Sequence, residues 1–176
     1  MVYNHNKGAI MATAIFYASD TGHTEDVAKQ IAEKLDNIEI FDIANTSIKK
    51  IEEYDKLIFG VSTWGEGDLQ DDWDGFIDEF SKIDLSGKTV ALFGLGDQDG
   101  YDDTYVDALG ILYEQVLAMG AKVIGGFDVD SDYDYESSAA IVDGKFVGLA
   151  LDEDNQEEFT EKRIDLWISQ IKDQIL

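Results

Sequence analysis

The chain has 176 residues, 44% of them hydrophobic, so it is long enough for one globular domain with a buried core. Its 13 basic and 38 acidic residues give a net charge of −25. That charge excludes nucleic-acid-binding modules and polybasic membrane anchors, which need a positive surface, and it favours basic partners. The absence of cysteine excludes disulfides, thiolate metal sites and thiol catalysis.

The N-terminal segment Met1–Met11 is polar and lacks the long apolar stretch and the cleavage pattern of a signal peptide. No apolar run approaches the ~20 residues of a membrane-spanning helix. We therefore expect a cytoplasmic protein with an N-terminal extension over residues 1–11 and one domain over residues 12–176. Met11 is a candidate start, in which case residues 1–10 are an alternative start or a remnant of cloning.

Strand and helix patterns then alternate almost to the C-terminus. In chain order, the expected elements are a strand at 13–18, a helix at 27–35, a strand at 38–43, a short helix at 47–54, a strand at 57–61, a helix at 73–80, a strand at 90–93, a helix at 109–117, a strand beginning at 123–124 and a helix at 164–175. Such alternation indicates repeated right-handed βαβ units and a parallel sheet.

The predicted fold is α/β, a three-layer doubly wound domain around a five-stranded parallel sheet. One segment interrupts the alternation: Gly125–Gly144 is long and polar, and Lys145–Leu151 again has the pattern of a strand. We therefore expect an insertion that splits the fifth strand in two. In such a sheet, ligands bind beyond the carboxyl ends of the strands, where the strand order reverses.

The loop after the first strand, Ser19–Thr24, has small hydroxyl residues and a glycine just before a predicted helix. Exposed N–H groups and the positive end of the helix dipole would favour an anion there. The loop contains no lysine or arginine, so a phosphate would be held by N–H and O–H donors alone. The alternative is an ordinary helix cap by Thr21 or Thr24.

Two further glycine-rich loops follow the third and fourth strands and each carries an aromatic residue. Trp64 precedes a Gly-x-Gly segment at 65–67, and Tyr101 follows the glycines of the 94–100 loop. Taken singly, Trp64 could cover the edge of the core and Tyr101 could be an exposed residue of an acidic loop. Together with the anion site they predict a cavity for a planar, phosphorylated ligand.

Four motifs resemble those of the flavodoxin family, in particular its long-chain branch: SDTGHT at 19–24, STWGEGDLQDDW at 62–73, FGLGDQDGY at 93–101 and GKFVGLALDEDNQ at 144–156. The resemblance covers the chain from about Ala12 to its end. It implies the flavodoxin-like fold and a low-potential one-electron carrier with non-covalent FMN, which shuttles between semiquinone and hydroquinone. It also implies a monomer without catalytic residues or a bound metal. Its transient partners would be basic redox proteins, a reductase donor and an oxidoreductase acceptor.

The resemblance also implies which residues bind FMN. They are Ser19, Asp20, Thr21, Gly22, His23, Thr24, Ser62, Thr63, Trp64, Gly65, Glu66, Gly67, Gly96, Asp97, Tyr101 and Asp134. Residues 19–24 would surround the phosphate, Trp64 and Tyr101 would stack on the two faces of the flavin, and 65–67 would meet its N5 edge. Asp97 would bond the pyrimidine edge, and Asp134 would reach a ribityl hydroxyl. His23 stands where asparagine is common in the family.

Two other functions share parts of these patterns. A phosphoacceptor receiver domain has the same fold class, but it needs acids after the first and third strands, where this chain has Ala18-Ser19 and Ser62-Thr63. An FMN-dependent quinone or nitro reductase would need a substrate pocket and NAD(P)H, so turnover with NADH by the protein alone would reveal it.

The acidic segment Asp128–Glu136 imitates a calcium loop through its alternating acids. However, the sixth position is Tyr133 where the loop needs glycine, and the twelfth is Ala139 where it needs glutamate. We interpret the segment as a solvated acidic loop.

Overall fold

The computed structural model describes residues 10–176, and the predicted extension lies outside them except for Ile10 and Met11, which begin the first strand. The central sheet has the strand order β10-β5-β3-β1-β2, and all pairs along this path are parallel. The five strands are β1 (Ile10–Tyr17), β2 (Glu39–Asp42), β3 (Tyr54–Trp64), β5 (Thr89–Leu95) and β10 (Leu149–Leu151). The chain runs from β1 outward to β2 and then returns to β3, so the strand order reverses between β1 and β3.

The predicted split of the fifth strand is confirmed. Both β6 (Lys122–Ile124) and β10 pair in parallel with β5, β6 along Thr89–Ala91 and β10 along Phe93–Leu95. The inserted segment differs from the expectation in one respect. Lys145–Phe146 is not part of the fifth strand but forms β9 of a separate antiparallel sheet with β7 (Phe127–Asp128) and β8 (Ile141–Val142). Strands of two residues have no periodicity that the sequence could reveal.

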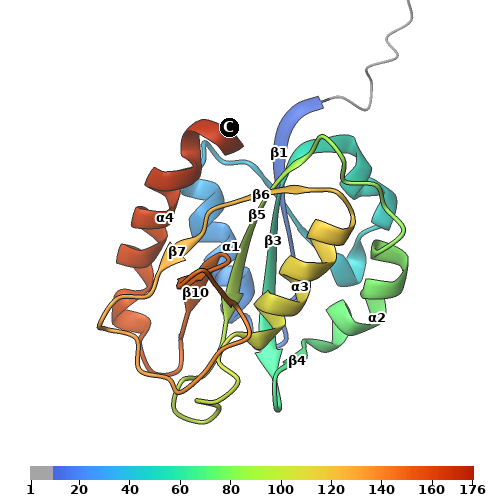
Figure 1. The fold of residues 1–176 in the computed structure, drawn as a ribbon. Coiled ribbons are helices and arrows are strands. Elements are labelled where there is room, and N and C mark those ends of the chain that lie inside the picture. Colours follow the sequence, from blue (N-terminus) through green and yellow to red (C-terminus); the bar gives the residue numbers. More distant parts are fainter. Residues whose placement is uncertain (1–9) are drawn as a thin grey trace, which may run out of the picture.

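Helices cover both faces of the sheet (Figure 1). On one side lie α1 (His23–Lys34) and α4 (Thr160–Ile175), and on the other lie α2 (Asp71–Phe80) and α3 (Asp107–Ala118). Their apolar residues recur every three or four positions and are buried, as in Val27, Ala28 and Ile31 of α1. The predicted short helix is the 3-10 helix η3 (Ile48–Glu53), and the remaining short elements are η2 (Ile43–Asn45), β4 (Asp68–Leu69) and η4 (Glu157–Phe159).

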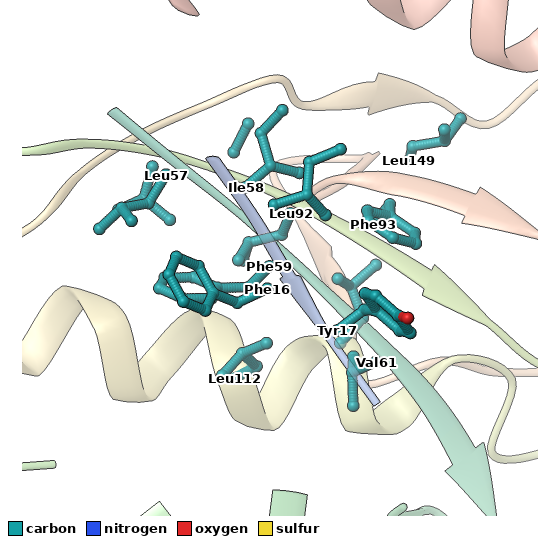
Figure 2. Packing of buried hydrophobic residues seen from close by; sticks show 14 of the residues in the cluster. Phe16, Tyr17, Leu57, Ile58, Phe59, Val61, Leu92, Phe93, Leu112 and Leu149 are labelled. Atoms are coloured by element: carbon teal, nitrogen blue, oxygen red, sulfur yellow. The ribbon is translucent and has the colours of Figure 1, made fainter. Parts of the chain in front are cut away.

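The central strands are apolar on both sides because helices bury each face of the sheet. Figure 2 shows Phe16 and Phe59 on the side of the strands that α3 covers. Phe59 packs edge-to-face against Trp73 and Phe80 of α2, with ring centroids 5.8 and 5.1 Å away. The Trp73 indole also donates a hydrogen bond of 2.8 Å to the carbonyl of Gly60. This packing fixes β3, whose far end carries Trp64.

Candidate functional site

A cavity of about 310 Å³ lies where the carboxyl ends of β1, β3, β5 and β10 meet. This volume falls in the range of small-molecule sites. The predicted residues that line it are Asp20, Thr21, His23, Thr24, Ser62, Thr63, Trp64, Gly65, Gly96, Asp97 and Tyr101. The three glycine-containing loops therefore converge on one cavity, as their places at the carboxyl ends of parallel strands predicted. The predicted residues that do not line it are Ser19, Gly22, Glu66, Gly67 and Asp134.

At one end of the cavity, α1 begins with its N-terminus free of a side-chain cap. Gly22 is the residue before the helix, and within residues 10–176 no side chain accepts a hydrogen bond from the first turn of α1. Ser19 does not line the cavity, and its hydroxyl accepts a hydrogen bond of 3.0 Å from the Gly22 N–H within the same loop. The alternative of a cap by Thr21 or Thr24 is thus not what the structure shows. The N–H groups of the first turn are left for an anion.

The charges around this end of the cavity are unusual for an anion site. In the described part of the chain, no lysine or arginine lines the cavity, and His23 is its one side chain that can carry a positive charge. Two carboxylates missed by the sequence reasoning, Glu153 and Asp154, also line it. They follow β10, so only the position of the second half of the split strand brings them here.

Both of these carboxyls have perturbed proton affinities. Burial is the main cause that raises the pKa of Glu153 above its usual range, with a smaller opposing effect of the Thr160 hydrogen bond. Burial also raises the pKa of Asp154, assisted by the negative charges of Asp97 and Asp152. A negatively charged ligand group would therefore meet a site whose acids already resist ionisation.

Two large aromatic side chains that line the same cavity remain open to solvent. Trp64 is 42% exposed and Tyr101 is 44% exposed, although most aromatic residues of the chain are buried. The Trp64 indole N–H donates a hydrogen bond of 2.9 Å to the Ser62 hydroxyl, which fixes the orientation of the ring. Two exposed aromatic faces at one cavity are suited to hold a planar ring between them.

The turn after Trp64 joins β3 to β4 and requires its two glycines. Gly65 has φ +53° and Gly67 has φ +96°, values that favour glycine. A Cβ atom on Gly67 would also lie 2.9 Å from Oδ2 of Asp107. Gly67 is therefore buried behind the turn, and Glu66 is exposed at its tip, so that neither lines the cavity.

Asp97 lies at the cavity, but one oxygen of its carboxylate is occupied by donors from its own loop and from the segment after β10. Its Oδ1 accepts hydrogen bonds from the N–H groups of Asp99 (3.0 Å) and Gly100 (2.8 Å) and from Asn155 Nδ2 (2.8 Å). Burial raises the pKa of this carboxyl, but these three donors outweigh burial and hold the pKa below its usual range. Oδ1 is therefore occupied, while Oδ2 has no hydrogen-bond partner within residues 10–176, and the expected bond of Asp97 to a ligand's ring edge stays a prediction.

Asp134 is placed away from the cavity. Its N–H donates a hydrogen bond of 2.7 Å to Oε1 of Gln98, and its side chain borders a second hollow with Asp99, Asp102 and Glu136. The inserted segment therefore packs on the outer side of the 97–101 loop. Asp154 lines the cavity and Asp134 does not.

Two predicted residues are held by partners that the sequence did not reveal. Gln70 is fully buried, and its Nε2 donates a hydrogen bond of 2.9 Å to Asp20. Its Oε1 accepts from the N–H groups of Asp72 and Trp73 and so caps α2. The Thr63 hydroxyl accepts a hydrogen bond of 3.0 Å from the Ala108 N–H at the start of α3.

The cavity thus combines helix N–H groups and threonine hydroxyls with two aromatic faces. This donor set fits a phosphate joined to a planar aromatic ring. Among residues 10–176, no three His, Asp or Glu side chains are placed to hold a metal ion. No helix in this part of the chain is both long and apolar enough to cross a membrane.

Comparison with known proteins identifies one family with this fold. The sequence model of the flavodoxin family matches residues 15–167. Flavodoxin of Picosynechococcus is 44% identical over 161 residues, which cover 90% of this chain and 94% of the relative. Flavodoxin 1 of Escherichia coli is 42% identical over 166 residues, covering 93% of this chain and 94% of that protein. The crystal structure of Fusobacterium nucleatum flavodoxin bound to flavin mononucleotide is 35% identical and superposes with a TM-score of 0.88, over 95% of this chain and 100% of that one.

Proposed function

The chain belongs to the flavodoxin family, and from this and its cavity we propose that it is an electron carrier that holds FMN without a covalent bond. One observation carries the proposal. The uncapped N-terminus of α1 and the exposed rings of Trp64 and Tyr101 face the same cavity at the point where the strand order reverses. FMN combines the two chemical groups, a phosphate and a planar ring, that this cavity fits.

The residues divide the binding between them. Thr21, Thr24 and the first-turn N–H groups of α1 would hold the phosphate, with His23 beside them. Trp64 and Tyr101 would enclose the ring and limit the access of water to it. When bound, FMN supplies the ability to take up and release electrons one at a time.

The acids around the ring would make the carrier a strong reductant. Asp68, Asp99, Asp102 and Asp103 are exposed on the loops that carry Trp64 and Tyr101. At an effective dielectric constant of ~20, each charge at ~8 Å from an added electron opposes it by about 2 kcal/mol before screening by salt. These carboxylates therefore lower the potential at which the cavity accepts further negative charge.

The same acids support a proposal about partners. A net charge of −25 and exposed acids beside Trp64 and Tyr101 would attract redox proteins with a basic surface and orient them toward the cavity. We propose brief encounters between a monomer and such partners, with electrons passing at the exposed edge near the two aromatic rings.

The alternative function, an FMN-dependent quinone or nitro reductase, is not supported. The relatives that match nine-tenths of the chain are flavodoxins, which transfer electrons and are not enzymes with a substrate of their own. The chain is accordingly an electron-transfer protein.

The proposal is tested by titrating the apoprotein with FMN and, in parallel, with riboflavin, which has the same ring but no phosphate. Quenching of flavin fluorescence reports both affinities. We expect FMN to bind at least about tenfold more tightly, because only its phosphate reaches the N-terminus of α1. Equal affinities would contradict the assignment of the phosphate end, and a protein that does not bind FMN would contradict the proposed function.

A further inference from the structure

The segment that follows β10 is tied to the 97–101 loop through two side chains. Asp152 is fully buried, and its carboxylate accepts hydrogen bonds from both the N–H and the Nε2 of Gln98, each 3.0 Å long. It also accepts from the N–H groups of Asp154 (3.1 Å) and Asn155 (3.0 Å) and so closes a turn of its own segment. A buried carboxylate with this many donors holds the two segments at a fixed distance.

Asn155 connects Asp152 to Asp97. Its Nδ2 donates to Oδ2 of Asp152 (2.9 Å) and to Oδ1 of Asp97 (2.8 Å). An amide group has two N–H protons, so one side chain can serve both carboxylates, which would otherwise repel each other. Without the Asn155 side chain, Asp97 and Asp152 would lose the amide donor that they share.

Asp97 in turn shapes the turn that carries Tyr101. Its Oδ1 accepts from the N–H groups of Asp99 and Gly100, and its carbonyl accepts a hydrogen bond of 3.1 Å from the Tyr101 N–H. The position of the Tyr101 ring at the cavity therefore depends on the orientation of the Asp97 carboxylate. That orientation depends on Asn155.

We propose that Asn155, supported by Asp152, is a positioning residue that fixes Tyr101 at the FMN cavity and so adjusts the affinity for FMN. The proposal rests on the proposed function for its ligand but on the hydrogen bonds of this chain for its geometry. Asn155 itself does not line the cavity, so its effect has to pass through Asp97 and Tyr101.

Gln156 provides a matched control for the role of Asn155. It is the next residue, and its Nε2 also donates a side-chain hydrogen bond, but to the carbonyl of Asp132 in the inserted segment (2.6 Å). Replacing Gln156 removes an amide donor from the same segment and leaves the bond to Asp97 in place. Asn155 is exposed, so its replacement by alanine should fold, whereas Asp152→Asn would place two amide groups face to face in the core.

The first test compares Asn155→Ala and Gln156→Ala in the full chain. We expect Asn155→Ala to lower the affinity for FMN about tenfold. The affinity for riboflavin should fall by the same factor, because Tyr101 contacts the ring that both flavins share. Gln156→Ala should change either affinity by less than about twofold. Equal losses in the two variants would overturn the proposal, because they would reflect a general loosening of the segment.

The second test asks whether Asn155 acts through Tyr101. In a double-mutant cycle, Asn155→Ala should cost nothing further in FMN affinity once Tyr101→Ala is present. Full additivity would overturn the proposal.

A third readout needs no ligand. In the apoprotein, hydrogen exchange of the Asp99 and Gly100 amides should become faster in Asn155→Ala and remain unchanged in Gln156→Ala. Unchanged exchange in Asn155→Ala would overturn the geometry even if FMN binds normally. If the unmodified protein did not bind FMN, the proposed function would fail, while this readout would still decide whether Asn155 holds the loop.

Discussion

At the scale of single residues, we expect the two exposed aromatic side chains to contribute to ligand binding and little to the stability of the fold. Trp64 and Tyr101 contribute little to the core because nearly half of each is open to solvent. Their exposed positions, at the end of β3 and in the 97–101 loop, are explained if they cover the planar ring of a ligand. A residue kept exposed at a cavity by a hydrogen bond, as Trp64 is by Ser62, is positioned for contact with a ligand.

Replacing Trp64 by alanine should therefore weaken FMN binding by roughly tenfold or more, because one stacking face is lost. The free energy of unfolding of the apoprotein should change by less than about 0.5 kcal/mol. Fluorescence titration and urea denaturation measure the two effects. Ile111→Ala on α3, where the side chain is 41% exposed, is the control and should alter neither quantity. A Trp64 variant that lost stability but kept its FMN affinity would contradict the assignment.

Glu153 should make the stability of the apoprotein depend on pH. Its folded-state pKa is raised above the ordinary value of 4.5, mainly by burial, so the ionised carboxylate destabilises the folded state above that raised pKa. The destabilisation disappears as the pH falls through the raised pKa toward 4.5. Glu153→Gln should accordingly stabilise the apoprotein at pH ~8 by an amount that shrinks as the pH approaches ~4.5.

Urea denaturation of both proteins at several pH values measures this difference. Glutamine retains an oxygen that can accept a hydrogen bond from the Thr160 hydroxyl, so the difference between the two proteins reports the effect of the negative charge alone. Glu158→Gln, at an exposed position on η4, controls for the general effect of removing one negative charge. A gain in Glu153→Gln that stays constant with pH would contradict the account.

At the scale of secondary-structure elements, the interior of β3 is packed too closely for any side chain at Gly60. A Cβ atom there would lie 2.1 Å from Cζ of Phe93 on the neighbouring strand β5. Gly60→Ala should destabilise the apoprotein by about 1–3 kcal/mol through overpacking. Gly75→Ala on α2 is the matched control. A Cβ atom there would meet nothing within 4 Å, so alanine should stabilise the helix by about 0.5–1 kcal/mol.

Urea denaturation of the two apoprotein variants measures both changes. The two changes in the free energy of unfolding should have opposite signs, because the same methyl group is added in a buried strand and on an exposed helix position. A Gly60→Ala protein as stable as the original would mean that Phe93 can move aside, and that the core around β3 and β5 is looser than the structure indicates.

The elements that the sequence predicted well are those with strong periodicity. The apolar runs of β1, β3 and β5 are buried as expected, as are the stripes of the four helices apart from a few positions such as the exposed Leu117 of α3, and β6 and β10 form the split fifth strand. The small sheet β7-β9-β8 was not predicted, because its strands have two residues each. Phe146 of this sheet packs against the rings of Tyr105, Tyr133 and Tyr135, a cluster that only the folded chain assembles.

The site was predictable where a loop follows a strand directly, and unpredictable where it depends on packing between distant segments. Residues 19–24, 62–65 and 96–101 follow β1, β3 and β5, which are neighbours in the sheet, so their convergence followed from topology. Glu153 and Asp154 reach the cavity only because β10 pairs with β5. Likewise, the side chain that donates to the Asp97 carboxylate belongs to Asn155, which is 58 positions away in the sequence, and no spacing rule connects the two residues.

At the scale of the whole molecule, we expect the net charge of −25 to oppose the uptake of a second electron at the cavity. The second electron adds negative charge next to exposed acids, and salt screens that repulsion over a Debye length of about 10 Å at 0.1 M. The midpoint potential of the second electron should therefore become less negative as salt is raised from about 0.05 to about 0.5 M. A potential that does not change with salt would show that the acids do not act on the ring.

The central claim, that this cavity makes the chain a one-electron carrier, is tested most directly by stepwise reduction of the FMN-loaded protein without oxygen. The visible spectrum and the potential are followed together through the titration. The account predicts two separate one-electron steps at different potentials, and no oxidation of NADH or NADPH by the protein alone. A single two-electron step, or turnover with either nucleotide in the absence of a partner, would contradict it.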